Sequence, residues 1–411
     1  MSLKDIKPIH RQDNILAGKG TRSTDYGREA FFLAFKPVLV GDPAPMEFAG
    51  SIKTSEMQAI WTWIIRDVMP EIKQSLDGVS DIFSAQEIIL PLLPEIFTKT
   101  SNVALSSSAN PQDERHLIAQ LGSEEIKNRL PVILNILRCQ PLLAKAVKFG
   151  QTANGLRDDE LGAALKSLPL KEVKVSSLLF HALVGEVKDP SSLILAASGI
   201  LGGAGEAVLK GGGFEPLIDA ILSHAQDQIS IVAAQSGHFG DVDLICKTIK
   251  RYHHLMRAVT GYVEVSRSSN WYKISADLTK QMGRLIEPRL NDISFNVTNS
   301  LRKERTGIDK LDADMLLNAL NGIYLLVALR EARETLALNA IFEKTWKETG
   351  QNLETLIDRN METYKLDPAN AIISQRLDMG IKMAEVRLGK EYSSALFNAK
   401  EAVSRRQKKA V

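Results

Sequence analysis

Apolar residues recur at helical spacing along most of the chain after residue 55. The first such segment begins at Ser55 and Gln58, which form a capping box at a helix start. Its apolar positions are Met57, Ile60, Trp61, Ile64, Ile65 and Val68. Because these positions lie on one side of an α-helix, the pattern predicts a helix with one buried face.

The same pattern predicts helices further along the chain. Asp189 and Pro190 suit the N-cap and the first turn of one helix, and Asp241 caps another that runs to about Val263. Residues 309–346 read as one long helix or as a pair broken at Gly322. No fixed repeat period links these segments, so the pattern does not support a regular solenoid.

Short β-favouring runs occur only near the N-terminus, within residues 30–52. They are interrupted by Pro37, Gly41, Pro43 and Pro45, which predicts a small hairpin or an extended strap. The whole pattern predicts a mainly α protein, a multi-lobed helical array or bundle with a small β or extended element near the N-terminus.

The composition and the segment pattern suggest four regions. Residues 1–53 form an arm with the short strap, and residues 54–188 form a helical lobe. Residues 189–306 form a central helical region with a basic face, and residues 307–411 form a C-terminal helical region with a basic tail.

The composition is that of an ordinary soluble globular protein, with 44% hydrophobic and 24% charged residues. Cys139 and Cys246 form neither a disulfide framework nor a zinc-binding spacing, which favours a reducing compartment. No segment resembles a signal peptide, and none reaches the roughly 18 uninterrupted apolar residues of a membrane-spanning helix. We expect a cytoplasmic protein and disfavour a membrane partner.

Charge is distributed unevenly, although the net charge is only +2. Residues 1–246 contain 23 Lys and Arg against 29 Asp and Glu, and residues 307–411 contain 16 against 15. Residues 247–306 contain 12 against 5, a local excess of positive charge. Such an excess indicates an anionic partner more strongly than the net charge does.

Two consecutive predicted helices carry most of this excess. The first has an apolar stripe formed by Ile245, Ile249, Tyr252, Met256, Val259 and Val263. Its opposite side carries Lys247, Lys250, Arg251, His254 and Arg257. The second contributes Trp271, Tyr272, Lys273, Lys280 and Arg284. Basic faces beside aromatic rings suit nucleic acid, because cations meet phosphates and rings stack on bases. Docking to an acidic protein surface, ion pairing with the acidic first part of the chain and a solvated face are the alternatives.

The glycine-rich stretch GILGGAGEAVLKGGG, residues 199–213, does not match a phosphate loop. Val208 replaces the third glycine of a dinucleotide motif, and Lys210 precedes Gly211, the reverse of the Walker order. We predict instead a helix with a face of small residues and a turn at residues 211–213. The small-residue face comprises Ser192, Ala196, Gly199, Gly203 and Ala207. Such a face lets a neighbour approach closely. The neighbour would be a helix of this chain, a second subunit or a membrane.

No motif predicts catalytic or metal chemistry. The segment LAGKGT, residues 16–21, has Asp13 where a Walker loop requires its first glycine. His253 and His254 are adjacent, so on a helix their rings diverge by about 100°. We therefore predict no catalytic residue, no metal site and no cofactor.

Abundant amphipathic helices without a catalytic motif favour a non-catalytic interaction or assembly protein that acts as a scaffold through its helical faces. A protein partner or self-association is the expected mode of action. The first alternative is a nucleic-acid-binding protein that coats single-stranded RNA or DNA with the basic helices of residues 247–289. The second alternative is an enzyme whose site is not recognisable from the sequence.

Overall fold

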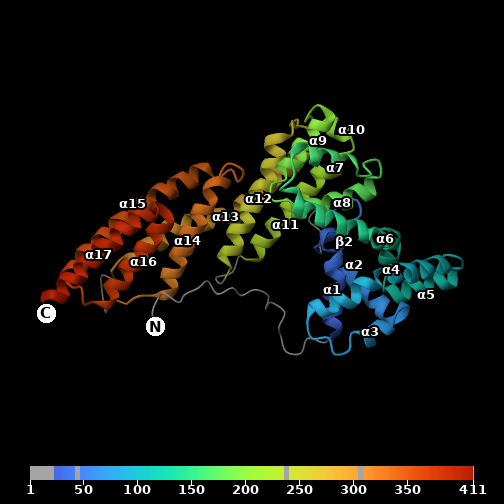
Figure 1. The fold of residues 1–411 in the computed structure, drawn as a ribbon, viewed down its shortest axis with the longest axis horizontal. Helices are drawn as coiled ribbons and strands as arrows, with labels where there is room; N and C mark the ends of the chain where they lie inside the picture. Colours follow the sequence, from blue (N-terminus) through green and yellow to red (C-terminus); the bar gives the residue numbers. More distant parts are fainter. Residues whose placement is uncertain (1–22, 42–46, 236–239, 304–309, 411) are drawn as a thin grey trace. The chain divides into compact units, whose positions relative to one another are not determined.

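The computed structural model describes residues 23–41, 47–235, 240–303 and 310–410. Within these residues the fold is mainly α-helical, with a small two-stranded sheet near the N-terminus (Figure 1). This confirms the predicted fold class. The segment LAGKGT lies outside the described residues, as do Pro43 and Pro45.

The chain divides into two compact units. The first consists of Met1–Ala153 and Pro169–Glu186, and the second consists of Asn154–Leu168 and Val187–Val411. The finer four-part division stays a prediction.

The first unit contains most of the short elements of the chain. Its elements are α1 (Ser23–Ala34), η2 (Lys36–Val38), β1 (Leu39–Val40), β2 (Ile52–Lys53), α2 (Thr54–Trp63), η3 (Ile64–Val68), α3 (Glu71–Ser75), α4 (Ile82–Ser107), α5 (Pro111–Leu121), α6 (Glu124–Ala153) and α8 (Val173–Glu186). α4 packs against α1 and α6, and α6 packs against α8.

The N-terminal element differs from the predicted hairpin. β1 and β2 pair in parallel, Leu39 with Ile52, so they do not form a hairpin. Residues 30–34, expected to be extended, belong to α1. The physical reason is burial, because Phe31 packs on Trp61 with ring centroids 5.1 Å apart, and this tertiary contact outweighs β propensity.

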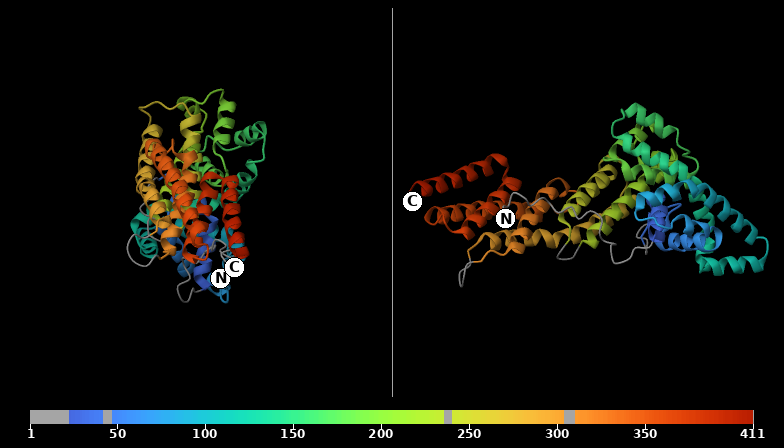
Figure 2. Two further views of the ribbon diagram at one scale, coloured as in Figure 1. Left: turned by 90° about the vertical axis from the view of Figure 1, so that its left-hand side faces the viewer. Right: turned by 60° about the horizontal axis from the view of Figure 1, so that its bottom comes forward.

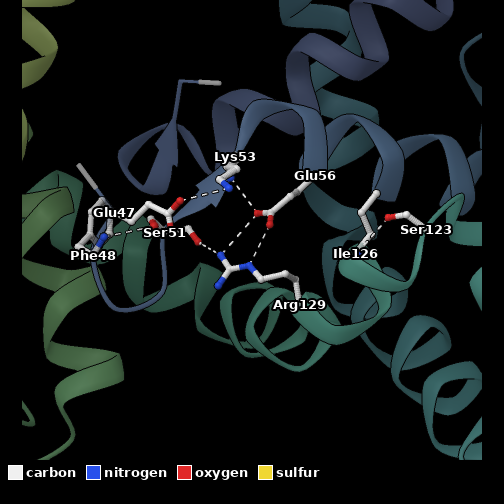
Figure 3. A network of polar contacts seen from close by, with 8 residues as sticks. All are labelled: Glu47, Phe48, Ser51, Lys53, Glu56, Ser123, Ile126 and Arg129. Atoms are coloured by element: carbon white, nitrogen blue, oxygen red, sulfur yellow. Dashed lines mark hydrogen bonds and ion pairs between the residues drawn. The ribbon is translucent and has the colours of Figure 1, made fainter. Parts of the chain in front are cut away.

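A polar network fixes the chain around β2 in this unit (Figure 3). Arg129 of α6 donates from Nε to Glu56 Oε1 at 2.9 Å and from a terminal nitrogen to the carbonyl oxygen of Ser51. The other carboxylate oxygen of Glu56 accepts from the Lys53 backbone N–H at 2.9 Å, at the start of α2. The Glu56 side chain is only 6% exposed, so its charge is matched within the unit.

The second unit is built from longer helices. They are α7 (Asp158–Lys166), α9 (Ser191–Leu201), α10 (Glu206–Gly211), α11 (Glu215–Ala234), α12 (Val242–Tyr262), α13 (Asn270–Leu301), α14 (Ala313–Ala332), α15 (Asn339–Leu366), α16 (Ala371–Leu388) and α17 (Lys390–Ala410). α15 packs against α13, α16 packs against α15 and α14, and α17 packs against α16 (Figures 1 and 2).

Four helices of this unit form a bundle in which neighbours in sequence are not always neighbours in space. α11 and α14 each pack against both α12 and α13. α12 and α13 therefore occupy opposite corners of the bundle. The predicted apolar stripe of α12 is buried as expected, with Ile245, Ile249 and Tyr252 fully enclosed.

Residues 309–346 form a pair of helices, and the break differs from the predicted one. α14 continues through Gly322 and ends at Ala332, and the turn before α15 contains Ala337 with φ of 54°. Gly322 instead permits a close contact, because a β-carbon there would lie 3.2 Å from Ile293 of α13. A side chain at Gly322 would require the Ile293 side chain to shift by a few tenths of an ångström.

Candidate anion-binding site

The basic residues predicted on α12 are mostly exposed. Lys250 and Arg257 are exposed, and His254 is half-buried. Lys247 is exposed and forms an ion pair with Asp243 one turn earlier, at 2.6 Å. The positive charge of this face is therefore partly matched on the same helix.

Two of the residues predicted to bind an anionic partner have structural contacts. Arg251 donates to the carbonyl oxygens of Val187 and Lys188 and so fixes the chain before α9. Trp271 is 2% exposed, and its indole N–H donates to Asp219 Oδ1 at 2.9 Å. A buried indole cannot stack on a nucleic-acid base.

The remaining candidates lie on α13. Tyr272, Lys273, Lys280 and Arg284 are exposed along this helix. Because α12 and α13 stand at opposite corners of the bundle, their outer faces point in different directions. The structure does not bring the two basic faces together into one surface.

The small-residue face is interrupted. α9 ends at Leu201 and Gly202 adopts a left-handed φ of 74°, so Gly203 and Ala207 lie beyond this helix. Ser192 is half-buried and Ala196 buried, but nothing lies within 4 Å of a β-carbon placed at Gly199. The close approach in this region is at Gly212, where a β-carbon would lie 2.5 Å from the Leu201 δ-carbons.

A pocket of about 320 Å³ lies where α13 ends, α14 begins and α16 packs beside them. It is lined by Asn299, Ser300, Arg302, Lys303, Lys310, Asp312, Met315 and Arg376. Its size falls within the usual range of small-ligand sites.

The lining of this pocket is strongly basic. Arg302, Lys303 and Lys310 are exposed, whereas Arg376 of α16 is only 2% exposed. Among the lining residues that the structure describes, Asp312 is the single carboxylate. Four cationic side chains around one hollow produce a positive potential that attracts anions.

Two asparagines of α15 hold the α13 side of the pocket. Asn360 donates to the carbonyl oxygen of Leu301, the last residue of α13, at 2.9 Å. Asn352 donates to the hydroxyl oxygens of Ser294 and Thr298 at 3.1 and 3.2 Å. These bonds fix the rotation of the end of α13 and therefore the direction in which Asn299 and Arg302 project.

The carboxylate of Asp312 and the hydroxyl of Ser300, the two pocket groups with acid–base or nucleophilic chemistry, are engaged in structural hydrogen bonds. Asp312 caps α14 by accepting from the backbone N–H groups of Asp314 and Met315 at 2.9 and 3.1 Å. The Ser300 hydroxyl donates to the carbonyl oxygen of Val297 at 3.1 Å. The arrangement is suited to holding an anion. In the described part of the chain, no group of three or more His, Cys, Asp or Glu side chains is placed to hold a metal ion.

The pocket was not among the sites predicted from the sequence. Arg302 and Lys303 belong to the basic excess of residues 247–306, which is the only signal that pointed to it. Arg376 lies in a segment with no local charge excess, and only the packing of α16 against α13 and α14 brings it to the pocket.

Two helices, α6 and α14, are long and apolar enough to cross a membrane by length and composition alone. Of their most apolar stretches, 33% and 39% respectively are buried within the protein. Core helices of soluble proteins share these properties, so two such helices are weak evidence for a membrane.

Comparisons with known proteins add no further constraint. No protein-family model, no curated protein and no solved structure matches this chain. The cytoplasmic location, the protein partner and self-association therefore stay predictions.

Proposed function

We propose that this is a non-catalytic helical binding protein whose second unit holds the phosphate groups of a nucleic acid in the pocket between α13, α14 and α16. One observation carries the proposal: Arg302, Lys303, Lys310 and Arg376 line one hollow, and Asp312 is the one carboxylate among its described lining residues. Contacts between such cations and phosphates supply most of the affinity of many nucleic-acid-binding proteins.

Phosphate fits the pocket better than the carboxylate of an acidic protein does. A nucleic-acid phosphodiester carries one charge on two non-bridging oxygens, as a carboxylate does, but every nucleotide of the strand carries such a group, so successive charges can enter one pocket together. The three exposed cations, Arg302, Lys303 and Lys310, can contact successive phosphates that enter the hollow. The alternative, docking to an acidic protein surface, would use a flatter array of cations.

A charge-reversal experiment tests the proposal. Binding of a fluorescently labelled 12-nucleotide RNA is measured by anisotropy for the wild type and for the Lys303→Glu/Lys310→Glu variant. Both lysines are exposed, so the fold should survive the change. We expect the dissociation constant to rise at least about tenfold, because two phosphate contacts become repulsive.

The matched control is Lys273→Glu/Lys280→Glu, which changes the charge of exposed α13 positions by the same amount. We expect this variant to bind within about threefold of the wild type, since it retains the pocket. An equal loss of RNA affinity in the two variants, or a larger loss in the control, would overturn the proposal that the pocket binds the RNA. Competition by polyglutamate as strong as that by unlabelled RNA would identify an acidic protein as the partner and overturn the choice of phosphate.

A further inference from the structure

An exposed aromatic side chain lies in line with the basic pocket. Phe295 of α13 is 67% exposed. Positions 295 and 299 are four residues apart and so share one face of the helix, and Arg302 is the extended residue that follows the last helical residue, Leu301. Asn299 and Arg302 line the pocket, and Phe295 stands one turn before Asn299 on the same face.

The charges on either side of Phe295 have opposite signs. Arg302 follows the end of α13 on the pocket side, whereas Asp292 lies about one turn from Phe295 on the other side. An anionic chain passing along the face is attracted at the pocket end and repelled at the Asp292 end. Met315, 38% exposed, adds an apolar contact at the rim of the pocket.

We infer that the pocket and Phe295 together bind a single-stranded nucleic acid, with phosphates in the pocket and a base stacked on the Phe295 ring. This inference rests on the proposed function. The helix rise places Phe295 about 6 Å along the axis from Asn299, close enough for one nucleotide to reach both. A base inside a duplex is stacked on both sides, so only an unpaired base reaches the ring.

A single exposed aromatic residue is ordinary on a protein surface. Tyr272, for example, is 44% exposed on the same helix but lies several turns from the pocket. What distinguishes Phe295 is its place one helical turn before Asn299, which lines the pocket. Tyr272 therefore provides the matched control for a stacking contact.

The experiment compares three polymers that all carry phosphates and differ in whether they offer an unpaired base. Dissociation constants are measured for a 12-nucleotide single-stranded RNA, for the corresponding duplex and for inorganic polyphosphate. We expect Phe295→Ala to weaken binding of the single strand about tenfold, the usual cost of one lost base–aromatic stack. Binding of polyphosphate should be unchanged, Phe295→Trp should retain the affinity for the single strand, and Tyr272→Ala should have little effect.

The results distinguish a failure of the stacking contact at Phe295 from a failure of phosphate binding in the pocket. If the Lys303→Glu/Lys310→Glu variant loses both the single strand and polyphosphate while Phe295→Ala binds the single strand like the wild type, the pocket stands and the stacking contact is wrong. Equal losses of polyphosphate and RNA in Phe295→Ala, or a duplex bound as tightly as the single strand, would also overturn it. If the wild type binds neither the single strand nor polyphosphate, the proposed function itself fails.

Discussion

The two units each contain an arginine-centred polar cluster, and the two clusters use positive charge differently. In the first unit, Arg129 donates to the carboxylate of Glu56 and to the carbonyl oxygen of Ser51, so the chain itself supplies the matching groups (Figure 3). In the second unit, Arg302, Lys303, Lys310 and Arg376 line one hollow, and Asp312 is the one carboxylate among its described lining residues. An ion pair matched within the chain fixes the fold, whereas an excess of one sign around a hollow is suited to a partner.

The physical reason lies in desolvation and repulsion. A charge removed from water costs several kcal/mol unless hydrogen bonds and an opposite charge compensate, as they do for Glu56. Like charges gathered around a pocket destabilise the unliganded fold, and a bound anion offsets this cost. The comparison therefore predicts that changes at Arg129 affect stability, whereas changes in the pocket affect binding.

The largest expected effect on stability follows removal of the matched arginine. Arg129→Met leaves the carboxylate of Glu56, 6% exposed, without its guanidinium. We expect the free energy of unfolding to fall by about 2 to 3 kcal/mol, the low end for a broken buried pair because Arg129 is 31% exposed. Urea unfolding followed by circular dichroism measures this change.

An exposed lysine provides the control for this prediction. Lys99 forms ion pairs with Glu71 and Glu95 and is 38% exposed. Lys99→Met should change stability much less than Arg129→Met, because exposed pairs contribute little. A loss as large as that in Arg129→Met would contradict the distinction between matched buried charge and surface charge.

A ligand should stabilise the second unit through its pocket. Polyphosphate at a hundredfold excess over its dissociation constant should raise the free energy of unfolding by about 2.7 kcal/mol. The Lys303→Glu/Lys310→Glu variant should gain far less, because its pocket repels the anion. Thermal unfolding with and without polyphosphate checks this, and equal stabilisation of the two proteins would place the anion elsewhere.

The smallest expected effect concerns Asp227 of α11, a partly enclosed carboxyl group whose Oδ2 lies 3.9 Å from His224 Nδ1, one turn earlier on the same helix. Burial raises the pKa of Asp227 to about 6. A raised pKa in the folded state means that its contribution to stability is full below about pH 3.8 and is lost as pH rises through about 6. Asp227→Asn should therefore stabilise the protein at pH 7.5, and the gain should shrink toward pH 4.

The gain at pH 7.5 should be below about 1 kcal/mol, since the Asp227 side chain is 48% exposed and solvent screens its charge. Urea unfolding of the wild type and of Asp227→Asn at pH 4 and pH 7.5 measures it. The same difference at both pH values would show that burial does not perturb this carboxyl group.

The helical architecture could be predicted because burial follows sequence periodicity. On α12, the predicted stripe members Ile245, Ile249, Tyr252, Met256 and Val259 are at most 1% exposed. A repeating apolar pattern is a local property of the chain, and it determines which face of a helix is buried.

The roles of individual glycines could not be predicted, because they depend on neighbours distant in sequence. Gly199 was expected at a close contact but faces open space, whereas Gly322 was expected at a break and lies against Ile293. The break itself falls at Ala337, a residue type that gives no sign of a left-handed conformation.

The candidate site was predictable only in part for the same reason. The basic excess in residues 247–306 includes Arg302 and Lys303, two of the residues that line the pocket. The sequence could not show that Trp271 is buried against Asp219 or that Arg376 joins the pocket. Both depend on which helices pack together.

The salt dependence of single-stranded RNA binding tests the central claim most directly. Log affinity against log salt concentration is measured for the wild type, for Lys303→Gln/Lys310→Gln and for the α13 control Lys273→Gln/Lys280→Gln. If the pocket holds phosphates, the slope should become shallower by about 1.4 in the first variant, the value for two lost phosphate contacts on a single strand, and stay unchanged in the control. An unchanged slope in the pocket variant would contradict the account.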